Sequence, residues 1–267
     1  MKKRLRVSTG VEIAYYDSGT GRPIVFLHSF GHTKAMWSPQ LTHCLEKGYR
    51  VVAPDMPGHG DSTFEPGVHT VDQIAGAYTE LAASLGLRRA IVAGISMGGY
   101  LALRLWACDP SWIGALVLSN TKAERDSDEI VARRRAQVAA IRQHGLAEFV
   151  RTGAPKRLSP RTLEQRPWVL DAVTMMNLAV SAEANAATLE AMAARADDTA
   201  VLASIDVPTL ITTGSDDGFI PAGAGAALHA GIGHSRLRVI PDTGHVSSLE
   251  NPTAYNEALD EFLESLS

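Results

Sequence analysis

The stretch Gly-Ile-Ser-Met-Gly-Gly at residues 94–99 decides the fold because of what stands on either side of it. An apolar, strand-like run occupies residues 90–93, and a helical pattern occupies residues 100–106. Strand, Gly-x-Ser-x-Gly and helix in this order are typical of a sharp turn that lifts a serine hydroxyl clear of a sheet edge. We expect Ser96 to adopt a strained positive φ, with glycines leaving room for the turn. The stretch therefore predicts a nucleophilic serine at the end of a strand.

The composition is that of an ordinary globular protein, with 45% hydrophobic and 20% charged residues in a chain of 267. The net charge of −4 gives no reason to expect a nucleic acid or an anionic membrane as partner. The basic N-terminus lacks the apolar region of a signal peptide, and no apolar run approaches the roughly 18 residues that span a bilayer. We therefore expect one large α/β domain in a cytoplasmic enzyme.

Cys44 and Cys108 are the only cysteines of the chain. Neither belongs to a Cys-x-x-Cys pair or has a histidine nearby at the spacing of metal ligands. We expect both to be free thiols, mostly buried, and we expect neither a metal site nor a cofactor.

Short apolar runs alternate with helical patterns along most of the chain. A run at residues 11–16 indicates an early antiparallel hairpin. The later runs are rich in Val, Ile and Leu, as in parallel strands that are buried on both faces. They lie at residues 23–28, 50–54, 90–93, 115–119, 209–213 and 237–240, with helical segments such as 71–85, 100–107 and 252–267. This rhythm predicts a doubly wound, mostly parallel sheet.

One interval interrupts that rhythm. Residues 121–205 contain no convincing strand and consist of helical stretches rich in Ala, Arg and Met. We expect them to form a helical cap over the carboxyl edge of the sheet. The core would then comprise residues 1–120 and 206–267.

A serine hydroxyl is a weak nucleophile that needs a base within hydrogen-bond reach, and the base needs a group to orient it. His245 follows the last predicted strand and is the preferred base among nine histidines. The orienting acid should follow the preceding strand, where Asp216 and Asp217 stand side by side. The Gly-x-x-Asp-x-x-x-Pro spacing favours Asp217, and the other place for such an acid holds Asn120.

Negative charge on the attacked carbonyl oxygen requires preorganised donors. We expect them to be the backbone N–H groups of Met97, at the start of a helix, and Phe30, in the loop after the strand at residues 23–28. The Phe30 ring and the Met97 side chain would also line the acyl pocket. Further candidates for its walls are Trp168, Met175, Phe219 and Val246, although residues like the first two more often pack a helix onto its core.

These residues together closely resemble the α/β-hydrolase superfamily over essentially the full length. The resemblance includes the stretch Asp-Met-Pro-Gly-His-Gly-Asp-Ser at residues 55–62. A narrower similarity, to 3-oxoadipate enol-lactonases, rests on Ser29, Met36-Trp37, Asn120-Thr121 and residues 191–197. Those lactonases tend to have Asn where His28 stands.

The resemblance implies a cofactor-free serine hydrolase that cleaves a small carboxylic ester or lactone through an acyl-enzyme. Perhydrolase (haloperoxidase-type) activity, carbon–carbon bond hydrolysis and acyl transfer would use the same residues, and a non-catalytic ligand receptor is the alternative outside enzymes. Nine basic residues against two acidic ones between residues 133 and 166 either steer a carboxylate-bearing substrate or form a solvated outer face.

Overall fold

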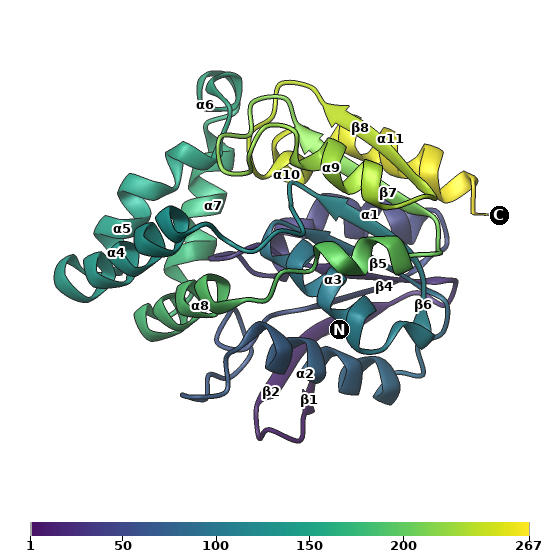
Figure 1. Ribbon diagram of the computed structural model, residues 1–267, viewed down its shortest axis with the longest axis horizontal. Coiled ribbons are helices and arrows are strands. Elements are labelled where there is room, and N and C mark those ends of the chain that lie inside the picture. Colours follow the sequence, from purple (N-terminus) through teal and green to yellow (C-terminus); the bar gives the residue numbers. More distant parts are fainter. Residues whose placement is uncertain (1, 267) are drawn as a thin grey trace.

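The computed structural model describes residues 2–266 and contains an eight-stranded sheet in the order β1-β2-β4-β3-β5-β6-β7-β8 (Figure 1). The strands are β1 (Lys2–Arg6), β2 (Glu12–Ser18), β3 (Pro23–Leu27), β4 (Arg50–Pro54), β5 (Ala90–Ile95), β6 (Ile113–Ser119), β7 (Thr209–Gly214) and β8 (Ser235–Ile240). β2 pairs antiparallel with both β1 and β4, and the other neighbouring pairs are parallel. The predicted doubly wound, mostly parallel sheet is confirmed.

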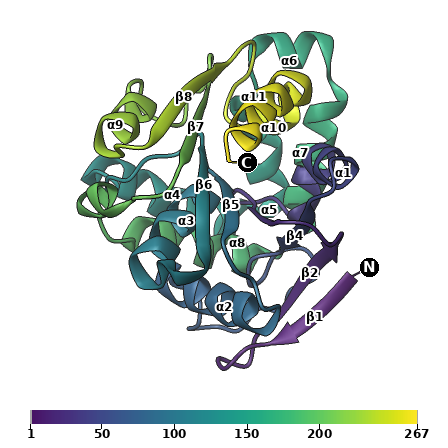
Figure 2. The same cartoon turned by 90° about the vertical axis from the view of Figure 1, so that its right-hand side faces the viewer.

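Helices cover both faces of the sheet (Figure 2). α2 (Val71–Ser84), α3 (Met97–Cys108) and α9 (Ala224–Gly231) pack into one hydrophobic core, and α1 (Ser38–Glu46) and α11 (Pro252–Glu264) pack into the other. Alternate residues of β5 enter opposite cores, with Val92 in the first and Ile91 in the second. Because both faces are buried, this strand is apolar throughout. The remaining short elements are α10 (Ser247–Glu250) and 3₁₀ turns at Lys34–Trp37, Pro110–Trp112, Pro155–Arg157 and Thr199–Ser204.

The chain between β6 and β7 is helical, and within the described residues it contains no strand. Its helices, called the inserted helices below, are α4 (Asp128–His144), α5 (Leu146–Gly153), α6 (Pro160–Gln165), α7 (Trp168–Leu178) and α8 (Ala182–Ala194). They lie to one side of the sheet, beyond the carboxyl ends of its parallel strands (Figure 1). They occupy the segment expected to form the cap, whereas the expected outer limits of the core, residues 1 and 267, lie outside the described residues.

Two features differ from the expectations. β1 was not predicted, because four of its five residues are Lys or Arg; it is an edge strand, where such charges are favourable. Both thiols are free and Cys44 is buried, but Cys108 is exposed at the last turn of α3. No helix among residues 2–266 combines the length and apolar character needed to cross a membrane.

Candidate active site

Ser96 stands at the tip of a strained turn between β5 and α3. Its backbone has φ 55° and ψ −114°, a conformation that a residue with a side chain rarely adopts. The turn is tight because its neighbours are glycines. A Cβ atom on Gly98 would lie 2.1 Å from the carbonyl oxygen of Leu27, and one on Gly94 would lie 2.1 Å from the carbonyl oxygen of Gly98. The packing of β3, β5 and α3 thus requires both glycines and fixes the position of Ser96.

The imidazole of His245 lies beside the Ser96 hydroxyl. His245 follows β8, and its Nε2 atom is 2.8 Å from Ser96 Oγ. The backbone N–H of His245 donates to the carbonyl of Arg157 at 2.7 Å, which ties this loop to the inserted segment. Both side chains are buried to more than nine-tenths. The structure therefore brings the predicted nucleophile and base within hydrogen-bond distance.

Asp217 completes a chain of three side chains. Its Oδ2 and Oδ1 atoms lie 3.0 and 3.1 Å from His245 Nδ1. A carboxylate only accepts hydrogen bonds, so Nδ1 of a neutral imidazole carries the proton and Nε2 accepts from the Ser96 hydroxyl. The neighbouring Asp216 is exposed, and its carboxylate accepts from Ser215 Oγ at 2.7 Å. Of the two adjacent aspartates, the structure places Asp217 on the imidazole.

The Asp217 carboxylate is held by further donors. The backbone N–H of Phe219 donates to Oδ1 at 2.8 Å, and Asn120 Nδ2 donates to Oδ2 at 2.9 Å. Burial acts to raise the pKa of Asp217, but His245 and the hydrogen bonds outweigh it and hold that pKa below its ordinary value. The carboxylate therefore stays ionised beside the imidazole.

Asn120 contacts the acid of the site and was not among the predicted site residues. It follows β6 with φ 46°, and its Oδ1 accepts from Ser247 Oγ at 2.6 Å while Nδ2 also donates to the carbonyl of Gly244 at 3.1 Å. Asn120 thus links the acid to the loop that carries His245. Its position at the carboxyl end of a parallel strand is the signal that could have predicted this role, whereas the sequence pattern was used only to reject Asn120 as the acid and to support the similarity to enol-lactonases.

The loop after β3 presents the backbone of Phe30 to the site. The Phe30 carbonyl accepts hydrogen bonds from His32 Nδ1 and Arg157 Nη1, each at 2.8 Å. Among the described residues, the Phe30 N–H has no hydrogen-bond partner. Met97 is the first residue of α3, where an N–H group has no carbonyl one turn earlier to accept from it. The backbone N–H groups of both predicted oxyanion donors are thus left without a partner among the described residues.

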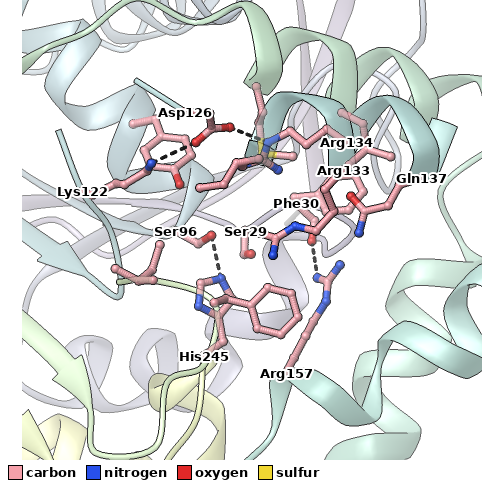
Figure 3. Close-up of a pocket in the computed structure, with 16 residues that line it drawn as sticks. Ser29, Phe30, Ser96, Lys122, Asp126, Arg133, Arg134, Gln137, Arg157 and His245 are labelled. Atoms are coloured by element: carbon pink, nitrogen blue, oxygen red, sulfur yellow. Dashed lines mark hydrogen bonds and ion pairs between the residues drawn. The ribbon is translucent and has the colours of Figure 1, made fainter. Parts of the chain in front are cut away.

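A pocket opens over Ser96 between the sheet and the inserted helices (Figure 3). Phe30 and Phe219 line it as expected, and the Phe219 ring stacks on His245 with centroids 5.1 Å apart. Its lining comprises Ser29, Phe30, Ser96, Tyr100, Lys122, Asp126, Ile130, Arg133, Arg134, Gln137, Arg157, Leu189, Met192, Phe219, Ile220 and His245. Three of its basic members, Arg133, Arg134 and Arg157, belong to the excess of basic residues between positions 133 and 166, whereas Lys122 lies outside that range.

Four proposed wall residues lie outside this lining. Met97 and Val246 are fully buried in the two cores and expose no surface to the pocket. Trp168 and Met175 are 62% and 71% exposed. The buried residues of α7 are Val169, Val173 and Asn177, at four-residue spacing, so Trp168 and Met175 fall on the opposite, solvent-facing side of the helix. The placement of these four side chains at the pocket wall is therefore corrected.

The fold and this constellation define the class of protein. A family model described as the alpha/beta hydrolase fold matches residues 22–252, and the chain belongs to this family. It is a hydrolase of the α/β-hydrolase superfamily.

Three similar proteins indicate the range of activities among its relatives. 3-Oxoadipate enol-lactonase 2 of Acinetobacter baylyi is 30% identical over 89% of this chain and 86% of its own. A non-heme haloperoxidase of Rhodococcus erythropolis is 31% identical over 97% of this chain and 98% of its own. A thermophilic esterase from Thermogutta terrifontis, solved with malate bound, is 30% identical with a TM-score of 0.94, covering 100% of this chain and 99% of its own.

Proposed function

We propose that this chain hydrolyses small carboxylic esters or lactones through an acyl-enzyme on Ser96. The observation that carries the proposal is the continuous hydrogen-bonded chain from Ser96 through His245 to Asp217, with distances of 2.8 and 3.0 Å. An uncharged imidazole in this tautomer is ready to accept the serine proton. An esterase and an enol-lactonase among the similar proteins support the substrate class.

The reaction follows from the geometry. His245 Nε2 takes the proton of Ser96 Oγ as this oxygen attacks the carbonyl carbon, and Asp217 stabilises the resulting imidazolium. The backbone N–H groups of Phe30 and Met97 stabilise the oxyanion, a contribution for which loss of one donor costs about 3–4 kcal/mol. His245 then protonates the leaving alkoxide oxygen. In the second half, water loses a proton to His245, attacks the acyl carbon and releases the acid and free Ser96.

Within this proposal the inserted segment, residues 121–205, is a cap, and residues 1–120 with 206–267 form the catalytic core. The cap supplies the far wall of the pocket through α4 and α8, which contribute Ile130, Arg133, Leu189 and Met192. The core supplies the reacting groups.

Hydrolysis of p-nitrophenyl acetate tests the proposal, and the release of p-nitrophenolate measures its rate. Wild-type protein is expected to turn over the ester, and Ser96→Ala is expected to reduce the rate to the uncatalysed level. A phosphonate ester should modify Ser96 alone, as judged by mass spectrometry of the digested protein. Turnover that survives Ser96→Ala, or an adduct on a different residue, would remove Ser96 from its proposed role.

Perhydrolysis is a second candidate, favoured by the similarity to a non-heme haloperoxidase. The same acyl-enzyme would be attacked by hydrogen peroxide in place of water, giving a peracid and free Ser96. Peracid formation from acetate and hydrogen peroxide, measured by bromination of monochlorodimedone, tests this activity. A Ser96-dependent peracid signal much faster than ester hydrolysis would make it the principal reaction.

A further inference from the structure

Arg157 is a buried cation that lines the pocket without an acidic partner. Its exposed fraction is 6%, and among residues 2–266 no carboxylate forms an ion pair with it. Nη1 donates to the carbonyl of Phe30 at 2.8 Å, and the guanidinium carbon lies 5.2 Å from the centre of the Phe30 ring. Burial, with a smaller contribution from the charge of Arg134, lowers the pKa of Arg157 to about 10. The side chain is still a cation at neutral pH.

A buried guanidinium without an acidic partner is unfavourable unless an anion binds to it. Removing a charged group from water carries a penalty of several kcal/mol, which buried cations normally offset by pairing with a carboxylate. A guanidinium offers five N–H donors in a fork that matches a carboxylate. In Arg157, Nε and Nη2 have no hydrogen-bond acceptor among the described residues, and Figure 3 shows the guanidinium turned toward the pocket. Nε carries one N–H group and Nη2 carries two, so three N–H groups are left for a ligand.

The Ser29 hydroxyl is a second, independent indication of a ligand at this wall. Ser29 is 1% exposed and lines the same pocket, yet its Oγ atom has no hydrogen-bond partner. The Ser29 backbone is bonded without this hydroxyl, because its N–H donates to Met36 Sδ at 3.3 Å and its carbonyl accepts from the His32 N–H at 3.2 Å. Buried hydroxyl groups are nearly always paired. An acceptor supplied by a bound molecule would satisfy this one.

The other charges at the pocket make an anion the expected ligand. Asp126 is the acidic residue of the lining, and it is paired with Lys122 at 3.0 Å and with Arg134 at 2.5 Å. Arg133 is exposed on α4 at the same pocket and forms no ion pair with a described residue. The lining therefore carries excess positive charge, with Arg157 buried and Arg133 open to solvent. An anionic substrate would be attracted to the rim and bound below it.

We propose that the substrates are esters or lactones that carry a free carboxylate, and that Arg157 and Ser29 bind this carboxylate. The inference rests on the proposed hydrolysis at Ser96 and defines its substrate class. Because Arg157 also holds the Phe30 carbonyl, the carboxylate is bound next to the loop that carries a proposed oxyanion donor. Binding the remote charge thereby positions the scissile carbonyl.

A matched pair of substrates separates carboxylate binding from loop support. The charged substrate is the mono-p-nitrophenyl ester of glutaric acid, and the neutral one is the same molecule with its carboxylate methylated. We expect wild type to favour the charged ester and Arg157→Met to lower the ratio of kcat/KM values, charged over neutral, at least tenfold. Ser29→Ala should lower the same ratio of kcat/KM values by a smaller factor, because it removes one neutral donor and no charge.

Arg151→Met is the control, because it removes the same charge from an inserted helix at a 71% exposed side chain outside the pocket lining. Its ratio should stay within about twofold of wild type, as exposed charges act weakly. If Arg157 only supports Phe30, Arg157→Met slows both esters equally and the ratio does not change. That result would overturn the carboxylate site while leaving the hydrolase proposal intact.

Binding of glutarate to Ser96→Ala protein, measured by calorimetry, keeps the inference testable without turnover. Glutarate is expected to bind, and addition of Arg157→Met should weaken its binding at least tenfold. If no ester is hydrolysed but glutarate binding depends on Arg157, the proposed function fails and the carboxylate site stands. Absence of glutarate binding to protein that retains Arg157 would refute the site.

Discussion

Asp217→Asn changes one atom of the carboxylate and is expected to remove most of the activity, because the surrounding donors leave the new amide no acceptable orientation. Asp217 Oδ1 accepts from the Phe219 N–H, while Oδ2 accepts from Asn120 and lies 3.0 Å from His245 Nδ1. If the amide NH₂ takes the Oδ1 position, it faces the Phe219 N–H, and two donors then oppose each other. If it takes the Oδ2 position, it faces the Asn120 amide and donates to His245 Nδ1.

The second orientation forces the neutral imidazole into the wrong tautomer. With Nδ1 accepting from the amide, the proton moves to Nε2, which then cannot accept from the Ser96 hydroxyl at 2.8 Å. The same substitution also removes the charge that stabilises the imidazolium. In a serine-protease triad this change lowers kcat by roughly 10⁴-fold, and we expect about 10³–10⁴-fold here. That loss corresponds to about 4–5 kcal/mol in the barrier.

Steady-state hydrolysis of p-nitrophenyl acetate provides the assay, with Asp216→Asn as the matched control. Asp216 is exposed and contacts Ser215, so its substitution should change kcat/KM by no more than about twofold. Melting temperatures of both variants establish that they are folded. Equal losses in the two variants, or a loss below tenfold in folded Asp217→Asn, would refute the assignment of Asp217 as the orienting acid.

Three further outcomes follow from neighbouring contacts. Asn120→Ala should lower kcat about 10–100-fold in the p-nitrophenyl acetate assay with little change in KM, because it removes the hydrogen bonds from Asn120 to Asp217 and to the loop that carries His245. An unchanged kcat would contradict a positioning role for Asn120. Gly98→Ala should lower the free energy of unfolding, measured in urea, by more than about 3 kcal/mol, because the new Cβ would lie 2.1 Å from a main-chain oxygen. Gly153→Ala is the control and should be nearly neutral, since a Cβ there has nothing within 4 Å. Similar urea midpoints for the two variants would argue against the tight turn. Burial lowers the pKa of His69 to about 4 in the folded protein. As the pH falls from about 6.5 to 4, His69 is therefore protonated in the unfolded chain but not in the folded one, and the free energy of unfolding should decrease over this range. The melting temperature should depend less on pH in His69→Gln than in the exposed His144→Gln, and identical pH profiles would refute this contribution.

The three hydrogen-bonded side chains proposed to react were predictable because nearby sequence determines where each of them lies. Ser96 is specified by the strand and glycines beside it, and His245 and Asp217 by their places after successive strands. The choice between Asp216 and Asp217 depended on spacing alone, and the structure places Asp217 at the imidazole. Where the backbone path follows from nearby residues, a sequence pattern is sufficient to position a side chain.

The pocket walls were not predictable in the same way. Which side of α7 is buried depends on what it packs against, and its apolar residues occur on both sides, so Trp168 and Met175 could not be distinguished from Val169 and Val173 by type. Arg157 was one of nine basic residues in its segment. Its contact with the Phe30 carbonyl spans 127 positions of sequence, and only the folded chain brings the two together.

The site is built in two parts that can change separately. Five site residues each follow the carboxyl end of a strand, so the sheet holds them in place. They are Phe30 after β3, Ser96 after β5, Asn120 after β6, Asp217 after β7 and His245 after β8. The unpaired charges of the pocket come from the inserted segment, on α4 and the turn at Pro155–Arg157. We expect substitutions there to alter substrate recognition without moving the sheet. We therefore expect the substrate preference of this chain to depend mainly on the charged residues of the inserted segment, and the chemical step to depend on the residues at the sheet edge.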